Sequence, residues 1–224
     1  MKFSFSYGTQ VDINQPLESI MTEAVTIDCR SCGLGELPVF ENCQQLKELR
    51  CSDNSIGSLV ISNCTNLETI ECQNCDLESL QISGCPNLRK LVCQGNRLTG
   101  LPTGLNLKYL NCSNNQLHAI PSMKRIKKLF CDNNQIVSLQ SMKRLKNLSC
   151  SKNQLHTLPS PSELPKLRRL DCRFNRLHGI AKYPKLKICD CFGNTIDVDQ
   201  QQKFQELSLM NFIIGNKKNF VLNI

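Results

Sequence analysis

The sequence predicts an α/β-class solenoid in which short turns of chain stack around one narrow core. Three observations lead to this prediction. Leucine or isoleucine recurs in a fixed pattern at steps of 19 to 22 residues, a cysteine takes the same place in each copy, and in most copies an asparagine follows it three residues later. The composition, with 40% hydrophobic and 21% charged residues, is that of a folded globular protein and excludes a disordered chain.

The repeated motif is LxxLxCxxNxL. Seven clear copies begin at residues 46, 67, 88, 107, 126, 145 and 167, and degenerate copies begin at residues 24 and 186. Self-similarity at this spacing is typical of leucine-rich repeats, at the short end of their range. We therefore expect a leucine-rich-repeat solenoid over residues 24–196, with about nine repeats of 19–22 residues.

The motif assigns a role to each of its positions. Positions 1, 4, 6 and 11 face the core, where a thiol replaces leucine at position 6 without strain. The asparagine amide at position 9 is expected to satisfy backbone groups where the chain turns, although Cys32 and Cys75 take its place in two copies. The position-6 cysteines are Cys29, Cys51, Cys72, Cys93, Cys112, Cys131, Cys150, Cys172 and Cys191.

The return segments are too short for helices. Each repeat leaves only about ten residues to cross the back, fewer than a helix of average length contains. Proline within residues 101–106 and 158–166 favours extended or polyproline-like chain there. The prediction is thus a curved parallel β-sheet on the concave face and a mostly extended or irregular convex face.

Both ends of a solenoid need caps, because terminal repeats expose core. Residues 1–23 are expected to form the N-terminal cap, with an apolar helical face made of Leu17, Ile20 and Met21. Residues 197–224 are expected to form a C-terminal capping helix or tail, in which Phe204 and Leu207 turn inward.

The cysteines are interpreted as structural. Their number, 15, is odd, so they cannot all pair within the chain, and this favours a reducing compartment. Cys29-x2-Cys32 and Cys72-x2-Cys75 have zinc-knuckle spacing. Stacking separates the two pairs by roughly 10 Å, and one zinc ion with sulfur ligands at about 2.3 Å cannot span that distance.

The sequence contains no pattern that indicates catalysis. Thiols buried at position 6 are expected to react poorly, and no Ser-His-Asp or Cys-His order is present. All three histidines follow the position-11 leucine and are expected to share one surface position, at His118, His156 and His178. We therefore expect no catalytic residue, no metal and no cofactor.

The net charge of +8 is divided unevenly along the chain. Residues 1–85 hold 4 basic and 12 acidic residues, a net charge of −8, and residues 86–190 hold 20 basic and 4 acidic residues, a net charge of +16. Residues 191–224 balance at 3 and 3. The middle repeats are therefore strongly basic, which suits an acidic partner.

Side chains at positions 2, 3, 5, 7 and 8 are expected on the concave face, because strand residues alternate between core and surface. Tyr109 and Phe130 are expected on neighbouring strands, with Phe174 extending their surface. Exposed aromatic residues bordered by arginine and lysine are typical of protein interfaces. The predicted partner-binding residues are Lys90, Lys108, Tyr109, Lys127, Lys128, Phe130, Arg168, Arg169, Asp171, Arg173 and Phe174.

Two repeats carry endings that resemble a known group of proteins. NNQLHAIP (114–121) and KNQLHTLP (152–159) are similar to the short leucine-rich repeats of injected bacterial effectors. These include stand-alone repeat effectors of the Legionella type and the substrate-recognition domains of novel E3 ligase effectors. The ligases carry a large catalytic domain with a Cys-x-Asp nucleophile motif after the repeats. Only 28 residues follow position 196 here, and Cys189 and Cys191 occupy core positions around Asp190.

The resemblance and the basic middle repeats together imply a non-enzymatic virulence effector. We expect a monomer that grips a host protein or another bacterial effector in its concave face and inhibits it by covering its active site. The alternative is binding of nucleic acid or an anionic membrane by the basic repeats, although the acidic first 85 residues would repel a long polyanion.

The sequence also bears on location. The N-terminal residues lack the basic head and apolar core of a secretory signal. No stretch approaches the roughly 18 apolar residues of a membrane helix. We therefore expect a bacterial cytoplasmic protein that reaches the host cell cytoplasm by injection through a specialised secretion system.

Overall fold

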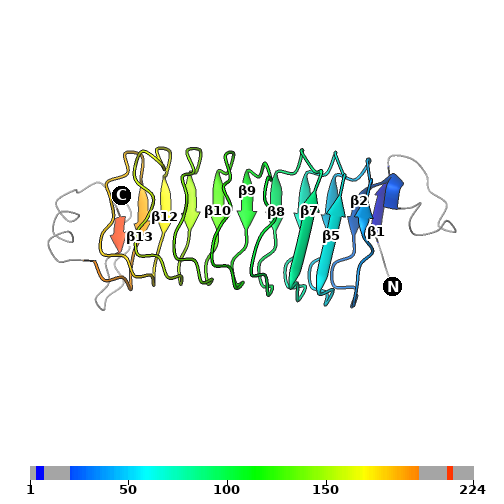
Figure 1. Ribbon diagram of the computed structural model, residues 1–224, viewed down its shortest axis with the longest axis horizontal. Helices are drawn as coiled ribbons and strands as arrows, with labels where there is room; N and C mark the ends of the chain where they lie inside the picture. Colours follow the sequence, from blue (N-terminus) through cyan, green and yellow to red (C-terminus); the bar gives the residue numbers. More distant parts are fainter. Residues whose placement is uncertain (1–3, 8–20, 197–210, 214–224) are drawn as a thin grey trace. The chain divides into compact units, whose positions relative to one another are not determined.

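A computed structural model describes residues 4–7, 21–196 and 211–213 of the 224-residue chain. The chain forms two compact units, Met1–Gln116 and Leu117–Ile224. Each unit is a stack of similar turns, and each turn contributes one short strand to a parallel sheet (Figure 1). This is the leucine-rich-repeat solenoid that the spacing of the motif predicts.

In the first unit the main sheet contains five parallel strands and one antiparallel strand. The parallel strands pair in register, so that Leu49 lies opposite Ile70 and Ile70 lies opposite Leu91. At the beginning of the sheet, the antiparallel strand β1 (Ser4–Tyr7) pairs with β2. The parallel strands are β2 (Ala24–Asp28), β4 (Glu48–Arg50), β6 (Thr69–Glu71), β8 (Lys90–Val92) and β9 (Tyr109–Asn111).

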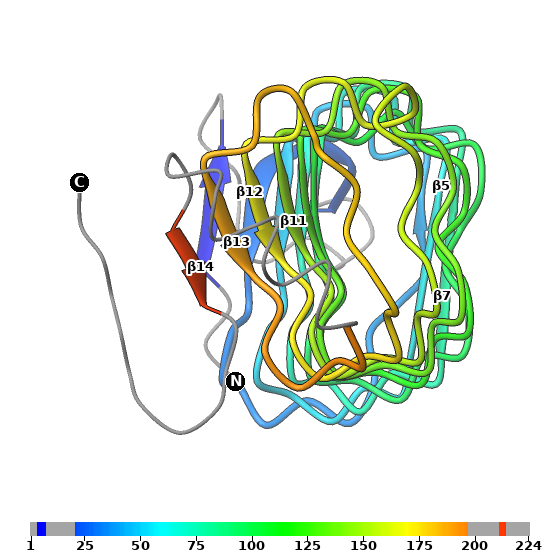
Figure 2. The same cartoon turned by 90° about the vertical axis from the view of Figure 1, so that its left-hand side faces the viewer.

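A second sheet, which the sequence did not lead us to expect, lies on the back of the first unit. It consists of the parallel strands β3 (Phe40–Glu41), β5 (Ser58–Ser62) and β7 (Ser79–Ser83). Figure 2 shows β5 and β7 across the core from the main sheet. These turns have 21 or 22 residues, and two of them carry alternating apolar residues in SLVIS and SLQIS, which suits a strand. The 22-residue turn that begins at residue 145 has Pro159, Pro161 and Pro165 in the corresponding segment instead.

In the second unit the strands follow one another in chain order. They are β10 (Lys128–Phe130), β11 (Asn147–Ser149), β12 (Arg169–Asp171), β13 (Ile188–Asp190) and β14 (Asn211–Ile213). All of the neighbouring pairs are parallel. The return segments of residues 117–196 contain no strand, as the short step and the prolines predict. Within the described ranges, helix is confined to residues 21–23.

The motif positions that we assigned to the core are buried. In the repeat that begins at residue 67, positions 1, 4, 6 and 11 are Leu67, Ile70, Cys72 and Leu77, and each is 0% exposed. The largest exposed fractions at these positions are in the repeat that begins at residue 186, where Leu186 retains 6% and Ile196 retains 7%. The core is therefore a narrow apolar column, in which thiols fill one row.

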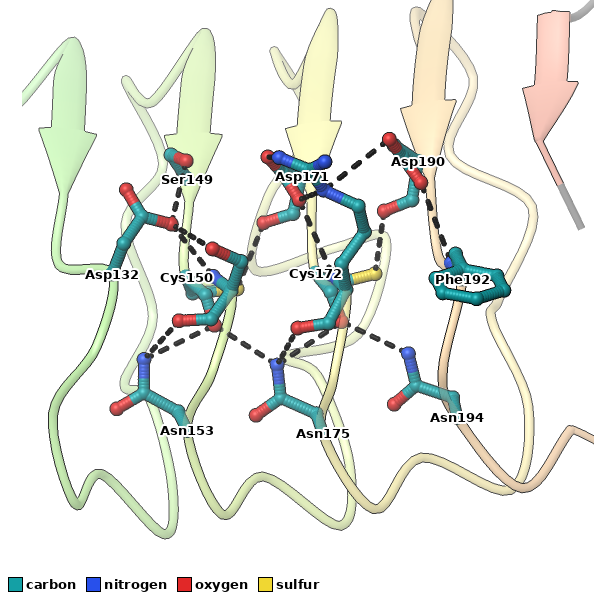
Figure 3. Close-up of polar contacts among 12 residues, drawn as sticks. Asp132, Ser149, Cys150, Asn153, Asp171, Cys172, Asn175, Asp190, Phe192 and Asn194 are labelled. Atoms are coloured by element: carbon teal, nitrogen blue, oxygen red, sulfur yellow. Dashed lines mark hydrogen bonds and ion pairs between the residues drawn. The ribbon is translucent and has the colours of Figure 1, made fainter. Parts of the chain in front are cut away.

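The predicted asparagine ladder is present, and it ties each turn to the one before. The side-chain amide of Asn175 donates to the carbonyl oxygens of Cys150 at 2.9 Å and Cys172 at 3.0 Å (Figure 3). Its side-chain oxygen accepts the backbone N–H of Leu155 at 3.0 Å. In the first unit Cys75 replaces asparagine, and its thiol donates to the carbonyl oxygen of Cys51 at 3.1 Å.

The predicted caps fall mainly outside the described residues. Leu17, Ile20, Phe204 and Leu207 all lie there, whereas Met21 is buried at the beginning of the described main segment. No helix in the described part of the chain is long and apolar enough to cross a bilayer.

Candidate functional site

Position 8 of the motif has a left-handed backbone in every repeat. The φ angles at this position lie between 52° and 72° in all nine copies. Glycine, asparagine and aspartate tolerate this conformation, whereas a bulky side chain rarely adopts it. Most copies obey this preference, but Phe174 has a φ of 52°. The residues in order are Ser31, Asp53, Asn74, Gly95, Asn114, Asn133, Lys152, Phe174 and Gly193.

Phe174 is also exposed, and the following repeat fixes its ring. The residue is 45% exposed, and its ring packs edge-on against Phe192, with centroids 5.2 Å apart and planes at 88°. A Cβ atom on Gly193 would lie 2.5 Å from Cδ1 of Phe174. The ring therefore occupies space above Gly193 that only glycine leaves open, and the apolar surface it presents is held in place.

Arg173, which precedes this ring, is held by two carboxylates. Its Nε donates to Asp171 Oδ1 at 2.9 Å, and one of its terminal guanidinium nitrogens donates to Asp171 Oδ2 at 2.7 Å. Nε also lies 3.3 Å from an oxygen of Asp190 on the next strand. The hydrogen bond to Asp171 raises the pKa of Arg173, and burial raises the pKa of Asp190. Arg173 and Asp171 therefore brace the surface beside Phe174, and their charges largely neutralise each other.

The other predicted cations of the second unit remain exposed. Lys127, Lys128, Arg168 and Arg169 form no ion pair within the described residues. Residues 117–196 hold 16 lysines and arginines against 4 aspartates and glutamates, a net charge of 16 − 4 = +12. Phe130 is half-buried on β10, and Ile188, at position 3 of β13, is 40% exposed. The sheet face thus combines apolar side chains with uncompensated positive charge.

The predicted residues of the first unit are arranged differently. Lys90 forms an ion pair with Glu71 at 2.6 Å, and its ammonium lies 6.0 Å from the centre of the half-buried Tyr109 ring. Lys108 is exposed. Tyr109 belongs to the first unit and Phe130 to the second, so their expected proximity stays a prediction.

Sequence reasoning missed Phe192, Gly193 and Ile188, although a signal for the first two was present. Phe192 and Gly193 occupy positions 7 and 8 of the repeat after Phe174. Comparing the same positions in adjacent repeats would have placed an aromatic and a glycine beside that ring. Ile188 gave less signal, because it stands where other repeats have charged or polar residues and its exposure depends on neighbouring side chains.

The cysteines and histidines do not assemble a reactive centre. All 15 cysteines are free, and all except the half-buried Cys32 are buried. Burial raises the pKa of Cys29 and of Cys93 to about 12, which keeps both thiols protonated and unreactive. The three predicted surface histidines are exposed. In the described segments no group of three or more His, Cys, Asp or Glu residues could hold a metal ion.

Comparisons with known proteins agree with this architecture. A family model described as leucine-rich repeats in two copies matches residues 105–142 and 143–197. No curated protein matches the chain by sequence.

Solved structures extend the likeness to most of the chain. The effector YopM of Yersinia pestis is 23% identical with a TM-score of 0.68, covering 76% of this chain and 55% of its own. A leucine-rich-repeat protein of Leptospira interrogans is 22% identical with a TM-score of 0.60, and the match covers 76% of this chain and 49% of that protein. A leucine-rich-repeat domain of a Shigella effector is 22% identical with a TM-score of 0.55, and the match covers 82% of this chain and 76% of that domain. The chain spans about half the length of the Leptospira protein. These likenesses concern the fold.

Proposed function

We propose that this leucine-rich-repeat chain is a protein-binding module whose contact surface on the second unit is centred on Phe174. The observation that supports this most strongly is an exposed phenylalanine held in a left-handed backbone conformation. Such a conformation costs on the order of 1–3 kcal/mol for a residue other than glycine, and the contact with Phe192 offsets only part of this cost. A residue that weakens folding in this way is typical of a binding site.

The surroundings of Phe174 suit a protein partner. Aromatic side chains that are already fixed contribute most to interface affinity, because little conformational freedom is lost on binding. Phe192 fixes the ring, and Ile188 adds apolar surface on β13. The exposed lysines and arginines would steer an acidic partner toward this face and contribute mainly to the association rate.

The partner is a host protein or another bacterial effector, and the chain acts as a virulence effector that inhibits it by covering its active site. Two likenesses support this part of the proposal. The endings of the repeats at residues 114–121 and 152–159 are those of short effector repeats, and solved effectors from Yersinia and Shigella share the fold. This function places the site of action in the host cell cytoplasm after injection.

Photo-crosslinking tests the surface directly. The photoreactive analogue benzoylphenylalanine replaces Phe174 in one variant and Lys152, at the same motif position one repeat earlier, in the control. Both variants are irradiated in extracts of the host cell and of the producing bacterium. We expect one discrete adduct from position 174 and none from position 152. Equal adducts at both positions, or none at 174 in either extract, would contradict the proposal.

The uncompensated charge of the second unit supports a second candidate, binding of nucleic acid or an anionic membrane. When a basic surface binds a polyanion, the affinity comes largely from the release of counterions, and it falls steeply as the salt concentration rises. Mobility shifts with RNA and sedimentation with phosphatidylserine vesicles, measured from about 50 to 200 mM salt, test it. Strong binding at low salt that disappears at high salt would favour this candidate, and no binding at low salt would exclude it.

A further inference from the structure

The second sheet of the first unit ends at an unpaired edge. The N–H of Asn63 donates to the carbonyl oxygen of Ser83 at 3.0 Å, so Ser83 directs its backbone groups toward β5. Residues alternate in direction along a strand, and Leu80 and Ile82 therefore direct their N–H and C=O groups away from β5. Among the described residues these four groups have no hydrogen-bond partner.

The chain on the other side of this edge does not pair with it. Residues 99–106 form no strand and make no backbone hydrogen bond within the described part of the molecule. The repeat that contains them has 19 residues, against 21 in the two repeats before it. Pro102 also lacks an N–H group. A fourth strand is thus missing at the place where the shorter repeats begin.

A groove of about 680 Å³ lies between β7 and residues 102–106. The residues that line it include the buried Leu80 and Ile82 and the exposed Gln81 and Ser83 of β7, together with Val60 and Ile61 of β5. The groove is therefore bordered by the edge strand β7 on one side and by residues 102–106 on the other. Its volume falls within the range of roughly 300–1,000 Å³ that is common for ligand sites.

We infer that this groove binds an extended segment of a partner protein, which joins β3, β5 and β7 as a fourth strand. The inference concerns the first unit and goes beyond the surface around Phe174. Two N–H and two C=O groups spaced along a strand match the backbone of another extended polypeptide, which supplies the complementary groups at the same spacing. This complementarity identifies the ligand class as a peptide.

The sheet also indicates which side chains the segment carries. Phe40, Ile61 and Ile82 form one inward row across the sheet, and Leu59 and Leu80 form a second. The outward row at the end of the sheet is Glu41, Ser62 and Ser83. A joining segment would continue these rows with two apolar residues at alternate positions and with small or polar residues between them.

A synthetic peptide provides the probe. The blocked peptide ESLQISG copies residues 78–84 and has the required alternation. Its binding to the full chain is followed by hydrogen exchange of the Leu80 and Ile82 amides, with up to about 1 mM peptide for the weak binding expected of so short a segment. We expect exchange at both amides to slow at least tenfold. A peptide N-methylated at alternate residues, which cannot complete the ladder, should have no effect.

Two substitutions in the chain distinguish peptide binding in the groove from peptide binding elsewhere on the protein. Thr103 is exposed and lines the groove, so Thr103→Trp should fill the groove and weaken peptide binding at least tenfold. Thr157→Trp, at an exposed threonine of the second unit, should leave binding unchanged. Unchanged exchange at Leu80 and Ile82, or equal binding of the methylated peptide, would overturn the inference. A chain that dimerises through this edge, detected by sedimentation, would overturn it in favour of a second copy as occupant.

Discussion

The ring of Phe174 packs edge-on against Phe192, with centroids 5.2 Å apart. The two residues belong to consecutive repeats, and their contact orients a side chain whose backbone has the unfavourable φ of 52°. Edge-to-face aromatic pairs contribute about 0.5–1.5 kcal/mol, which offsets part of the roughly 1–3 kcal/mol of strain. The contact therefore explains how the repeat tolerates phenylalanine at a position that elsewhere holds mostly asparagine, aspartate or glycine.

Replacement of Phe174 by asparagine separates stability from binding. Asparagine occupies this position as Asn74, Asn114 and Asn133 and tolerates the left-handed conformation. We expect Phe174→Asn to keep the free energy of unfolding or to raise it by up to about 1 kcal/mol. The same substitution should weaken binding of the partner that is identified by crosslinking. Urea unfolding at equilibrium measures the first effect, and affinity for the crosslinked partner measures the second.

Lys152→Asn is the matched control, because Lys152 has the same φ of 52° but lies one repeat earlier. It should also be neutral or stabilising and should leave partner affinity unchanged. A loss of more than about 1 kcal/mol in Phe174→Asn would show that the aromatic pair stabilises the fold more than the strained backbone weakens it.

The repeats and their core were predictable because each motif position has one dominant role. The steps of the motif located the strands, and apolar residues at Leu67, Ile70 and Cys72 are buried as their positions require. The second sheet was not predicted, since SLVIS and SLQIS are short alternating segments whose strand character depends on neighbouring turns of 21 residues. Strands this short form when adjacent copies pair in register.

The candidate site was predictable only in part. Position in the motif indicated that Phe174 and Arg169 face solvent, and both are exposed. It did not reveal that Asp171 and Asp190 hold Arg173, because an ion pair depends on side-chain directions within and between repeats. Motif position also gave no sign that Phe174 is strained, since φ angles follow from the geometry of the turn.

Removing one rung of the asparagine ladder should weaken folding strongly. Asn96 donates to the carbonyl oxygens of Cys72 and Cys93 and accepts from the N–H groups of Cys75 and Leu77. Asn96→Ala leaves the Cys72 carbonyl and the N–H groups of Cys75 and Leu77 without this partner, whereas the Cys93 carbonyl still accepts from Asn115. At about 1 kcal/mol or more for each of the three groups, we expect a loss of roughly 3 kcal/mol. Urea unfolding measures it. Asn106→Ala, at an exposed residue, should change stability by less than about 0.5 kcal/mol.

Alkaline pH should destabilise the protein through its buried thiols. Burial raises the pKa of Cys29 and of Cys93 to about 12, whereas an unfolded thiol has a pKa of about 8.5. Above that value the unfolded chain loses protons that the folded chain keeps, so stability is fully present below about pH 8.5 and falls as pH rises toward 12. Each such thiol contributes up to about 1.4 kcal/mol per pH unit.

The slope of stability against pH, obtained from urea unfolding between about pH 7.5 and 10.5, checks this expectation. Cys93→Ala should lower stability at every pH because it leaves a cavity. Its free energy of unfolding should fall less steeply with pH than that of the parent chain, because one titrating thiol is absent. Identical slopes would mean that Cys93 binds the same number of protons in the folded and unfolded chains, which would contradict a raised pKa in the folded state.

Tyr183 stabilises the second unit through one buried hydrogen bond. It is 1% exposed, and its hydroxyl donates to the carbonyl oxygen of Pro159 at 2.6 Å. Burial also holds its pKa above the ordinary value. Tyr183→Phe keeps the ring but leaves the buried Pro159 carbonyl without this donor, so we expect a loss of about 1–2 kcal/mol in urea unfolding. Lys182→Ala, at the exposed neighbour, should be neutral. If Tyr183→Phe unfolds at the same urea concentration as the parent chain, water or another donor must satisfy that carbonyl.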